Sequence, residues 1–260
     1  MTRPAPPLLQ VERLSRSFGG VVATDQLDLA VGAGEAHAVI GPNGAGKTTL
    51  LAQLAGELRP SAGHIRFAGR DITDLPAHTR VRIGLARSFQ ITSLLQSFTA
   101  AQNVQIALRP RFGHSFAFWR DAARDEGLNR RAATLLAEVG LAGRGDTLAA
   151  ELAHGEQRQL ELAMALASAP RLLLLDEPMA GVGHDEAARM VELLLRLKRD
   201  RAMLLVEHDM DAVFRIADRI TVLVGGRVLA SGPPAAIRDD PRVRDAYLGE
   251  PQLGAAGGPA

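Results

Sequence analysis

The feature that most constrains this chain is a glycine-rich segment, Gly41-Pro42-Asn43-Gly44-Ala45-Gly46-Lys47-Thr48. It fits the pattern G-x-x-x-x-G-K-[ST], in which glycines let the backbone curl until successive N–H groups point into one concavity that suits a polyphosphate. A helix N-terminus behind the segment would add partial positive charge. Lys47 would reach the outer phosphates, and the Thr48 hydroxyl would bind Mg²⁺. The segment therefore predicts a phosphate-binding loop between a strand and a helix.

The choice of lysine supports this prediction over an ordinary glycine-rich turn. Lys47 is one of two lysines in the chain, the other being Lys198, and arginine supplies the remaining basic side chains. A compact ammonium fits among phosphate oxygens better than the planar guanidinium fork of arginine does.

A second motif is an apolar run that ends in two acids, Leu172-Leu173-Leu174-Leu175-Asp176-Glu177. A buried strand would deliver Asp176 at its carboxyl end, where open α/β sheets bind ligands. There Asp176 would hold Mg²⁺ through water, and Glu177 would polarise the attacking water. A strand can also end in an acid simply because the chain reaches solvent. The pairing with the glycine loop favours the functional interpretation.

The wider pattern predicts an α/β fold with a largely parallel sheet. Short apolar patterns predict strands at 8–14, 25–31, 36–40, 63–67, 171–175, 203–206 and 219–224. Helical patterns predict helices at 48–58, 76–83, 185–199 and 210–217. Between about 91 and 165 the strand signals fade and helical spacing takes over, which predicts a mostly helical insert.

Composition argues against several classes of protein. The net charge of +1, from 30 basic and 29 acidic residues, shows no basic excess of the kind that nucleic-acid binding usually requires. The chain has no cysteine, so it forms no disulfide and no thiolate metal site. No run of about 18 apolar residues is present, and no signal peptide is expected at the proline-rich start. Residues 251–260 are expected to form a flexible tail.

Taken in order, the motifs resemble the nucleotide-binding subunit of an ABC transporter. The glycine loop is the Walker A motif of that family, followed by Leu152-Ala153-His154-Gly155-Glu156-Gln157-Arg158, by Asp176-Glu177-Pro178 and by Val206-Glu207-His208-Asp209. The resemblance runs from about residue 8 to residue 250. It implies an ATP-hydrolysing P-loop fold with an N-terminal antiparallel β part, and ATP and Mg²⁺ as cofactors. It also implies one nucleotide-binding domain over 1–260, with a core at about 8–90 and 166–250 and a helical subdomain at about 91–165.

The same resemblance assigns roles to single residues. Phe18 matches the aromatic residue that stacks on adenine, although a core phenylalanine is the alternative. Residues 41–49, through Thr49, would bind the nucleotide. Gln90 matches the Q-loop glutamine, which touches Mg²⁺ and water. His208 matches the switch histidine at the γ-phosphate, so the resemblance implies that Glu177, His208 and Lys47 are the catalytic residues.

Two segments depart from the pattern of the family. The signature segment, residues 152–157, usually reads L-S-G-G-Q and covers the ATP of the opposite subunit. Here Ala153 lacks the serine hydroxyl, and Glu156 would bring negative charge toward the phosphates if it pointed inward. Gly183 stands where the D-loop usually has an aspartate. These departures predict a heterodimer in which the partner subunit supplies the better cap.

Within the family, the chain is most similar to the longer ATPase subunit of branched-chain amino acid importers. The similar segments are Gly84-Leu85-Ala86-Arg87-Ser88-Phe89-Gln90, the insert after Asn103-Val104, the residues from His154 to Glu161, and Ala246-Tyr247-Leu248-Gly249-Glu250. This likeness implies uptake of such amino acids or related amides. It also implies a second ATPase subunit, two permeases, a periplasmic or extracellular substrate-binding protein, and a peripheral position on the cytoplasmic face of the inner membrane.

Two other functions remain open on the sequence alone. A lipid or lipopolysaccharide exporter ATPase would share most of these motifs. An ABC ATPase that acts on nucleic acid or ribosomes usually carries two cassettes, long coiled coils or zinc modules. This chain has one Walker A motif, no cysteine and no long heptad run, so we expect no nucleic-acid partner.

Overall fold

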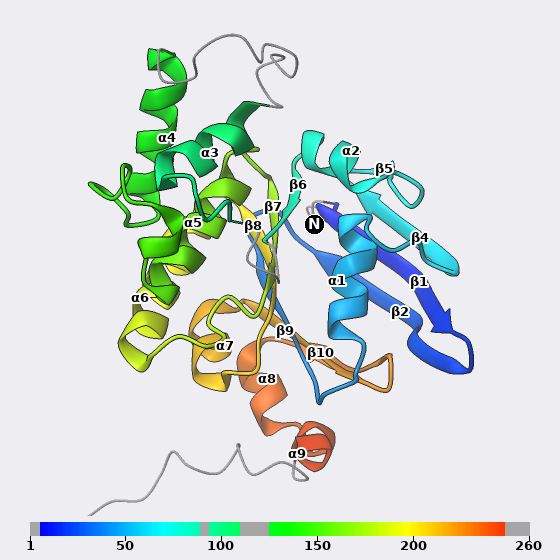
Figure 1. Cartoon of the computed structure of the whole chain (residues 1–260). Coiled ribbons are helices and arrows are strands. Elements are labelled where there is room, and N and C mark those ends of the chain that lie inside the picture. Colours follow the sequence, from blue (N-terminus) through cyan, green and yellow to red (C-terminus); the bar gives the residue numbers. More distant parts are fainter. Residues whose placement is uncertain (1–5, 89–93, 110–124, 248–260) are drawn as a thin grey trace, which may run out of the picture. The chain divides into compact units, whose positions relative to one another are not determined.

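The computed structural model describes residues 6–88, 94–109 and 125–247 (Figure 1). The chain divides into two compact units. The first consists of Met1–Ala77 together with Ala202–Ala260, and the second of His78–Arg201. The first unit is thus built from two segments far apart in the sequence.

The first unit contains an antiparallel sheet, as the family resemblance implies for the N-terminal part. Its strands are β1 (Leu9–Phe18), β2 (Val21–Val31), β4 (Ala62–Phe67) and β5 (Arg70–Asp71), in the order β2-β1-β4-β5. Leu9, Val11 and Leu14 of β1 are buried. Gly19, with φ 57°, lies in the tight turn that lets β1 return as β2.

The same unit contributes four strands to a second sheet that is mostly parallel. Its strands are β3 (Ala36–Ile40), β8 (Ala202–Val206), β9 (Arg219–Val224) and β10 (Arg227–Gly232). The central strand β3 pairs in parallel with both β8 and β9, and β10 pairs antiparallel with β9. Every residue of β3 and β8 is buried, as expected for parallel strands covered on both faces. The helices of this unit are α1 (Lys47–Ala55), α7 (Met210–Ile216), α8 (Pro234–Asp239) and α9 (Pro241–Tyr247).

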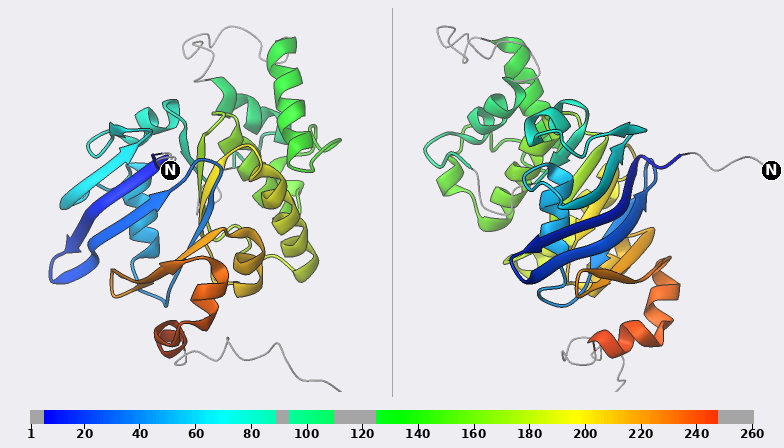
Figure 2. Two further views of the ribbon diagram at one scale, coloured as in Figure 1. Left: turned by 180° about the vertical axis from the view of Figure 1, so that it is seen from behind. Right: turned by 90° about the vertical axis from the view of Figure 1, so that its right-hand side faces the viewer.

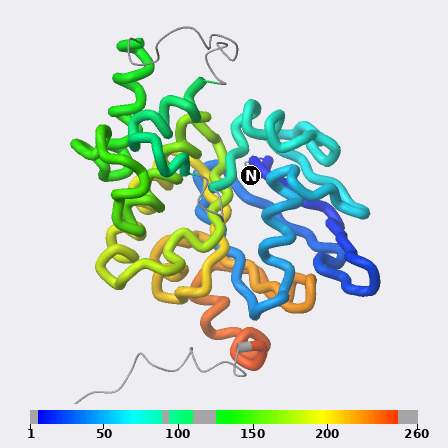
Figure 3. The backbone as a smooth tube through the Cα atoms, in the orientation of Figure 1, coloured from blue at the N-terminus to red at the C-terminus, as the bar shows by residue number. Residues whose placement is uncertain are grey.

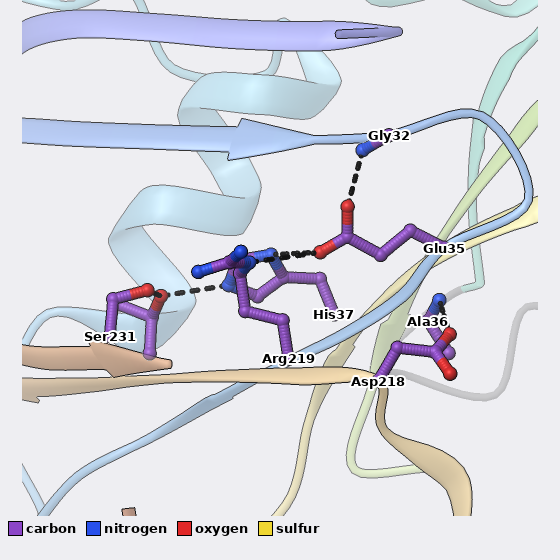
Figure 4. A network of polar contacts seen from close by, with 8 residues as sticks. Gly32, Glu35, Ala36, His37, Asp218, Arg219 and Ser231 are labelled. Carbon is purple, nitrogen blue, oxygen red and sulfur yellow. Dashed lines mark hydrogen bonds and ion pairs between the residues drawn. The ribbon is translucent and has the colours of Figure 1, made fainter. Parts of the chain in front are cut away.

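A buried polar network joins the start of β3 to β9 and β10 (Figure 4). The His37 ring lies 2.7 Å from the Thr221 hydroxyl through Nε2 and 3.1 Å from Glu35 through Nδ1, and Thr221 in turn contacts Ser231 at 2.8 Å. Burial alone would raise the pKa of Glu35, but hydrogen bonds from His37 and from the Gly32 N–H outweigh it and hold that pKa below its usual value. Because these contacts satisfy the polar groups, His37 can be buried four residues before the glycine loop.

The second unit combines two short parallel strands with several helices. Strands β6 (Leu85–Arg87) and β7 (Leu172–Asp176) are parallel. The helices are α2 (Ala77–Arg82), which begins at the boundary between the units, α3 (Ala100–Leu108), α4 (Glu126–Glu138), the 3₁₀ helix η3 (Ala149–Glu151), α5 (His154–Leu166) and α6 (His184–Leu197). Helices α3, α4 and α5 pack on one another (Figure 2). Within the described residues of the predicted helical insert, helices joined by loops make up the regular secondary structure.

The predicted elements recur with shifted ends. The predicted helix at 48–58 is Lys47–Ala55, and it stops early because Gly56 adopts a left-handed φ of 78° and donates its N–H to Ala52 and Gln53 carbonyls. Strands β5, β6 and β10 and helices α8 and α9 were not predicted individually. The fold class is confirmed, with an antiparallel N-terminal sheet, a largely parallel second sheet and a helical part.

Candidate functional site

The glycine loop links β3 to α1, a path that Figure 3 traces along the chain. Gly41 has φ 155° and Gly46 has φ 98°, a range that side-chain-bearing residues rarely adopt. A Cβ at Gly41 would lie 2.2 Å from the Leu223 carbonyl oxygen, and one at Gly46 would lie 2.1 Å from the Ala23 carbonyl oxygen. Glycine is therefore required at both positions by backbone packing as well as by φ.

Lys47 is the first residue of α1 and curls back over the loop. Its Nζ donates to the carbonyl oxygens of Gly41 at 2.6 Å and Pro42 at 3.0 Å. No acidic residue lies in the first turn of α1, so nothing there offsets the positive end of the helix dipole. Asn43, Gly44 and Thr48 are exposed, whereas Ala45 is buried. An ammonium, a helix N-terminus and an exposed hydroxyl thus converge where a phosphate group would bind.

Phe18 ends β1 with 48% of its surface exposed, so it is not a core phenylalanine. The Arg16 guanidinium lies 4.9 Å from the centroid of the Phe18 ring. The Arg16 side chain is itself held by the Arg59 carbonyl oxygen, to which its Nη1 donates at 3.0 Å. An exposed aromatic ring of this kind can stack on a base.

His208 follows β8 in the first unit. Its side chain is 62% exposed, and its Nδ1 lies 3.9 Å from the carboxylate of the buried Glu207. The same carboxylate accepts the His208 backbone N–H at 3.1 Å. Asp209 caps α7 by accepting the Ala212 N–H. The backbone at His208 is therefore fixed from both sides while its ring is presented to solvent.

Asp176 ends β7 in the second unit, where it is buried and paired with Arg87. Its Oδ2 accepts a hydrogen bond from Arg87 Nη2 at 2.7 Å. Its Oδ1 is also buried and has no hydrogen-bond partner among the described residues. A buried carboxylate oxygen without a partner destabilises the fold unless an ion or a water molecule binds to it. Because Mg²⁺ prefers oxygen ligands and retains waters, this oxygen fits the expected metal.

Glu177 lies directly after β7 in a strained backbone conformation. Its φ is 47°, in the left-handed region, and its carbonyl accepts the Ala180 N–H at 3.0 Å. A glutamate in this region costs roughly 1–2 kcal/mol, and such strain gathers at functional sites. Residue spacing gave no indication of this strain.

The signature segment forms the N-terminus of α5. Ala153 is the N-cap and provides no side-chain cap. Glu156 instead accepts the Ala153 N–H at 3.0 Å and pairs with Arg144 through two hydrogen bonds of 3.0 and 2.9 Å. The hydrogen bonds from Arg144 chiefly lower the pKa of Glu156, against a smaller opposing effect of burial. Much of the Glu156 charge is thus neutralised within the chain itself.

The rest of the segment is anchored to its surroundings in the same unit. Gln157 donates through its side chain to the carbonyls of Ala149 and Leu152, both at 3.1 Å. A Cβ at Gly155 would lie 2.8 Å from the Glu186 carboxyl carbon, so α5 begins close against α6. Glu186 also accepts the N–H of Gly183, the N-cap of α6, at 3.3 Å. The signature segment and the start of α6 are therefore in contact.

The predicted site residues divide between the two units. The first unit carries Phe18, residues 41–49 and His208, and the second carries residues 152–157, Asp176 and Glu177. Gln90 lies outside the described residues. The sequence did not indicate the two arginine partners, Arg87 and Arg144, because neither spacing nor composition distinguishes them from other arginines.

Two family models match the sequence. One, described as ABC transporter, matches residues 24–180. The other, described as branched-chain amino acid ATP-binding cassette transporter, matches residues 227–252. Together they include the glycine loop, the signature segment and the C-terminal part of the chain.

Known proteins similar to this chain match along almost its whole length. It is 39% identical over 251 residues to the high-affinity branched-chain amino acid transport ATP-binding protein BraF of Pseudomonas aeruginosa, covering 94% of this chain and 98% of that protein. It is 38% identical over 254 residues to LivG of Escherichia coli, another protein of that description, with the same coverage. It is 37% identical over 244 residues to the lipopolysaccharide export system ATP-binding protein LptB of Acidithiobacillus ferridurans, covering 94% and 97%.

Solved structures agree with these matches. The crystal structure of a nucleotide-free ATP-binding cassette from an ABC transporter superposes with a TM-score of 0.83 at 28% identity, covering 94% of this chain and all of that one. The ADP conformation of an ATP-binding cassette of an ABC transporter gives the same TM-score and identity, covering 94% and 99%.

Proposed function

The chain belongs to the ABC transporter family, and we propose that it is the ATP-hydrolysing subunit of an importer of branched-chain amino acids or related amides. The observation that carries the substrate class is the match of residues 227–252 to the branched-chain amino acid model. It supplements the identity of 38–39% to BraF and LivG over almost the whole chain.

The second candidate function is lipopolysaccharide export. Its support is the 37% identity to LptB, which is close to the identity shared with the importer subunits. Overall identity therefore discriminates weakly between import and export. The C-terminal match favours import, because it concerns a segment outside the ATPase motifs that all members need.

For nucleotide binding we propose roles that follow the Walker motifs. The N–H groups of residues 41–49 and the Lys47 ammonium would bind the phosphates of ATP, and Phe18 would stack on adenine. Thr48, Gln90 and Asp176 would hold Mg²⁺, Asp176 through water and by its buried Oδ1. Bound there, the metal would neutralise charge on the β- and γ-phosphates.

In ATP hydrolysis the protein mainly positions the reacting groups and stabilises the charge of the transition state. Glu177 would orient and polarise a water whose oxygen bonds to the γ-phosphorus as the bond to the bridging oxygen of ADP breaks. His208 would donate a hydrogen bond to the γ-phosphate. The exposed ring of His208 and the strained backbone of Glu177 are both compatible with these roles.

We propose that two ATPase subunits face each other, each covering the ATP of the other with its signature segment. Ala153 offers no hydroxyl and Gly183 no carboxylate, so the partner is expected to be a different chain with a more usual segment. Opening and closing of the pair would drive two permease subunits, with a substrate-binding protein delivering the amino acid.

The remaining proposal concerns where the chain works. In the described residues, no helix combines the length and the apolar character needed to cross a bilayer. We propose peripheral attachment to the cytoplasmic face of the inner membrane through the permeases.

The experiment that tests the proposal is purification of the intact complex, followed by identification of its bound ligand by mass spectrometry. We expect a leucine-type amino acid or a small amide, together with two permeases and a second ATPase subunit. Recovery of lipopolysaccharide instead would replace import with export.

A further inference from the structure

We propose that Arg87 is a positioning residue for Mg²⁺, which acts by holding one oxygen of Asp176 and leaving the other for the metal. This inference rests on the proposed function, because it concerns how the ATPase accepts MgATP. The proposed metal role of Asp176 follows from its motif, whereas no motif includes Arg87.

The sheet places Arg87 beside Asp176. Strand β6 runs parallel to β7 with Arg87 opposite Leu174, two residues before Asp176. The Ser88 N–H continues this pairing by donating to the Leu174 carbonyl at 2.9 Å. From this register the Arg87 Nη2 reaches Asp176 Oδ2 at 2.7 Å. The contact is therefore fixed by strand pairing rather than by a mobile loop.

Burial makes this contact matter energetically. The Asp176 side chain is 1% exposed and that of Arg87 is 10% exposed. A carboxylate this deep is unfavourable without a counter-charge, and the guanidinium supplies one before any metal arrives. Only Oδ2 is used, however, and Oδ1 stays buried without a hydrogen-bond partner in the described part of the chain. The arrangement orients the carboxylate and reserves Oδ1 for the magnesium hydration shell.

The other arginine nearby has a different partner. Arg158 lines the same small cavity as Asp176, but its Nη1 donates to the buried Glu161 at 3.1 Å. Arg158 and Glu161 thus form their own buried pair, and the counter-charge contact to Asp176 comes from Arg87. Arg158 is therefore a matched control, since it is also an arginine in a buried ion pair beside the site.

This geometry has a measurable consequence for metal dependence. Without Arg87, the Asp176 carboxylate would lose the contact that orients it, and Oδ1 would no longer be held ready for the metal. The magnesium gain is defined as the dissociation constant of a non-hydrolysable ATP analogue in EDTA divided by that in Mg²⁺. Calorimetry measures it without any turnover. We expect Arg87→Gln to lower this gain at least about tenfold, which corresponds to about 1.4 kcal/mol.

Two further variants complete the comparison. Arg87→Lys retains the positive charge and should stay within about threefold of the wild-type gain, and so should Arg158→Gln. An Arg87→Gln protein that is folded by circular dichroism and has the wild-type gain would overturn the inference. Failure of the wild-type chain to bind the analogue at all would instead overturn the proposed function.

Arg87→Gln alone risks misfolding because it strands a buried carboxylate. In that case the same substitution is made in the Asp176→Asn variant, which has no carboxylate at position 176. There, adding Arg87→Gln should leave the magnesium gain unchanged, since Arg87 acts through Asp176. A tenfold change in that background would show an independent role and contradict the inference.

Discussion

At the scale of single residues, Glu177 combines an expected chemical role with an observed strain. It follows the buried strand β7 with a φ of 47°. Glycine would adopt this φ without strain, whereas glutamate adopts it at a cost in free energy. A glutamate at a position whose φ favours glycine is what we expect if its carboxylate has a functional role.

Glu177→Gln is expected to retain ATP binding and lose turnover. The amide keeps the size of the side chain but cannot accept a proton or polarise water as a carboxylate does, so hydrolysis should fall at least about a hundredfold. Phosphate release measures turnover, and calorimetry measures binding. Lys47→Ala is the contrasting variant, because it should lose affinity for ATP. Wild-type turnover by Glu177→Gln would exclude Glu177 as the residue that acts on water.

Candidate site residues could be identified where they stand in a locally spaced motif. Lys47, Asp176 and His208 each stand in a short motif that can be recognised without a structure. The partners of two of the acids were not predictable. Arg87 is 89 residues from Asp176, and Arg144 is 12 residues from Glu156 across the turn before α5. Only the fold brings these charges together.

At the scale of elements, the glycine loop depends on its two constrained glycines. Gly46→Ala would place a Cβ against the Ala23 carbonyl in a left-handed conformation, so we expect a loss of at least about 3 kcal/mol in the free energy of unfolding. Gly44→Ala is the matched control. It has φ 78° but no atom within 4 Å of the new Cβ, and should cost about 1–2 kcal/mol. Urea denaturation measures both, and equal losses would contradict the packing argument.

The start of α5 should depend on pH through Glu156. Its pKa is lowered from the ordinary 4.5 in the folded chain, so its ionised form stabilises the fold above that pH. The contribution is lost as pH falls through the lowered pKa. At pH 7 we expect Glu156→Gln to melt about 2 °C below the wild type, with the difference vanishing well below pH 4.5.

Glu126, an exposed glutamate at the start of α4, supplies the control for that series. Glu126→Gln should melt with the wild type to within about 1 °C across the same pH range. A Glu156→Gln difference that stays constant down to pH 3 would mean that its carboxylate charge does not support α5.

Elements were predicted best where the apolar pattern has clear ends. Strand β3 was placed at its observed bounds, and α6 and α7 to within two residues at each end. Strand β6 has three residues, too few for a pattern, yet it delivers Arg87 to Asp176. Strand β10, with the sequence RVLASG, lacks the alternation that marks a strand and forms by pairing with β9.

At the scale of the whole molecule, the departures at Ala153 and Gly183 predict that this chain works best with a different partner. As an isolated homodimer it should hydrolyse ATP at least about tenfold more slowly than the complete complex. Ala153→Ser, which restores the hydroxyl, should raise the turnover of the homodimer. Robust hydrolysis by the isolated wild-type chain would contradict the heterodimer.

The fold class was predictable because alternating strands and helices, a glycine loop and a helical insert allow few architectures. The division into two compact units was harder to predict, since one boundary falls after the first residue of α2 and the other directly before the first residue of β8. The class of transported substrate is harder still to predict from this sequence, because the ATPase subunit is not expected to contact the transported molecule.

The most direct test of the account is the initial rate of labelled leucine uptake by cells that lack this chain. We expect the deletion to reduce uptake, the wild-type chain to restore it, and Glu177→Gln to leave it reduced although that variant is present at wild-type levels. Uptake that is unaffected by the deletion, or restored equally by Glu177→Gln, would contradict the proposal that ATP hydrolysis by this chain drives amino-acid import.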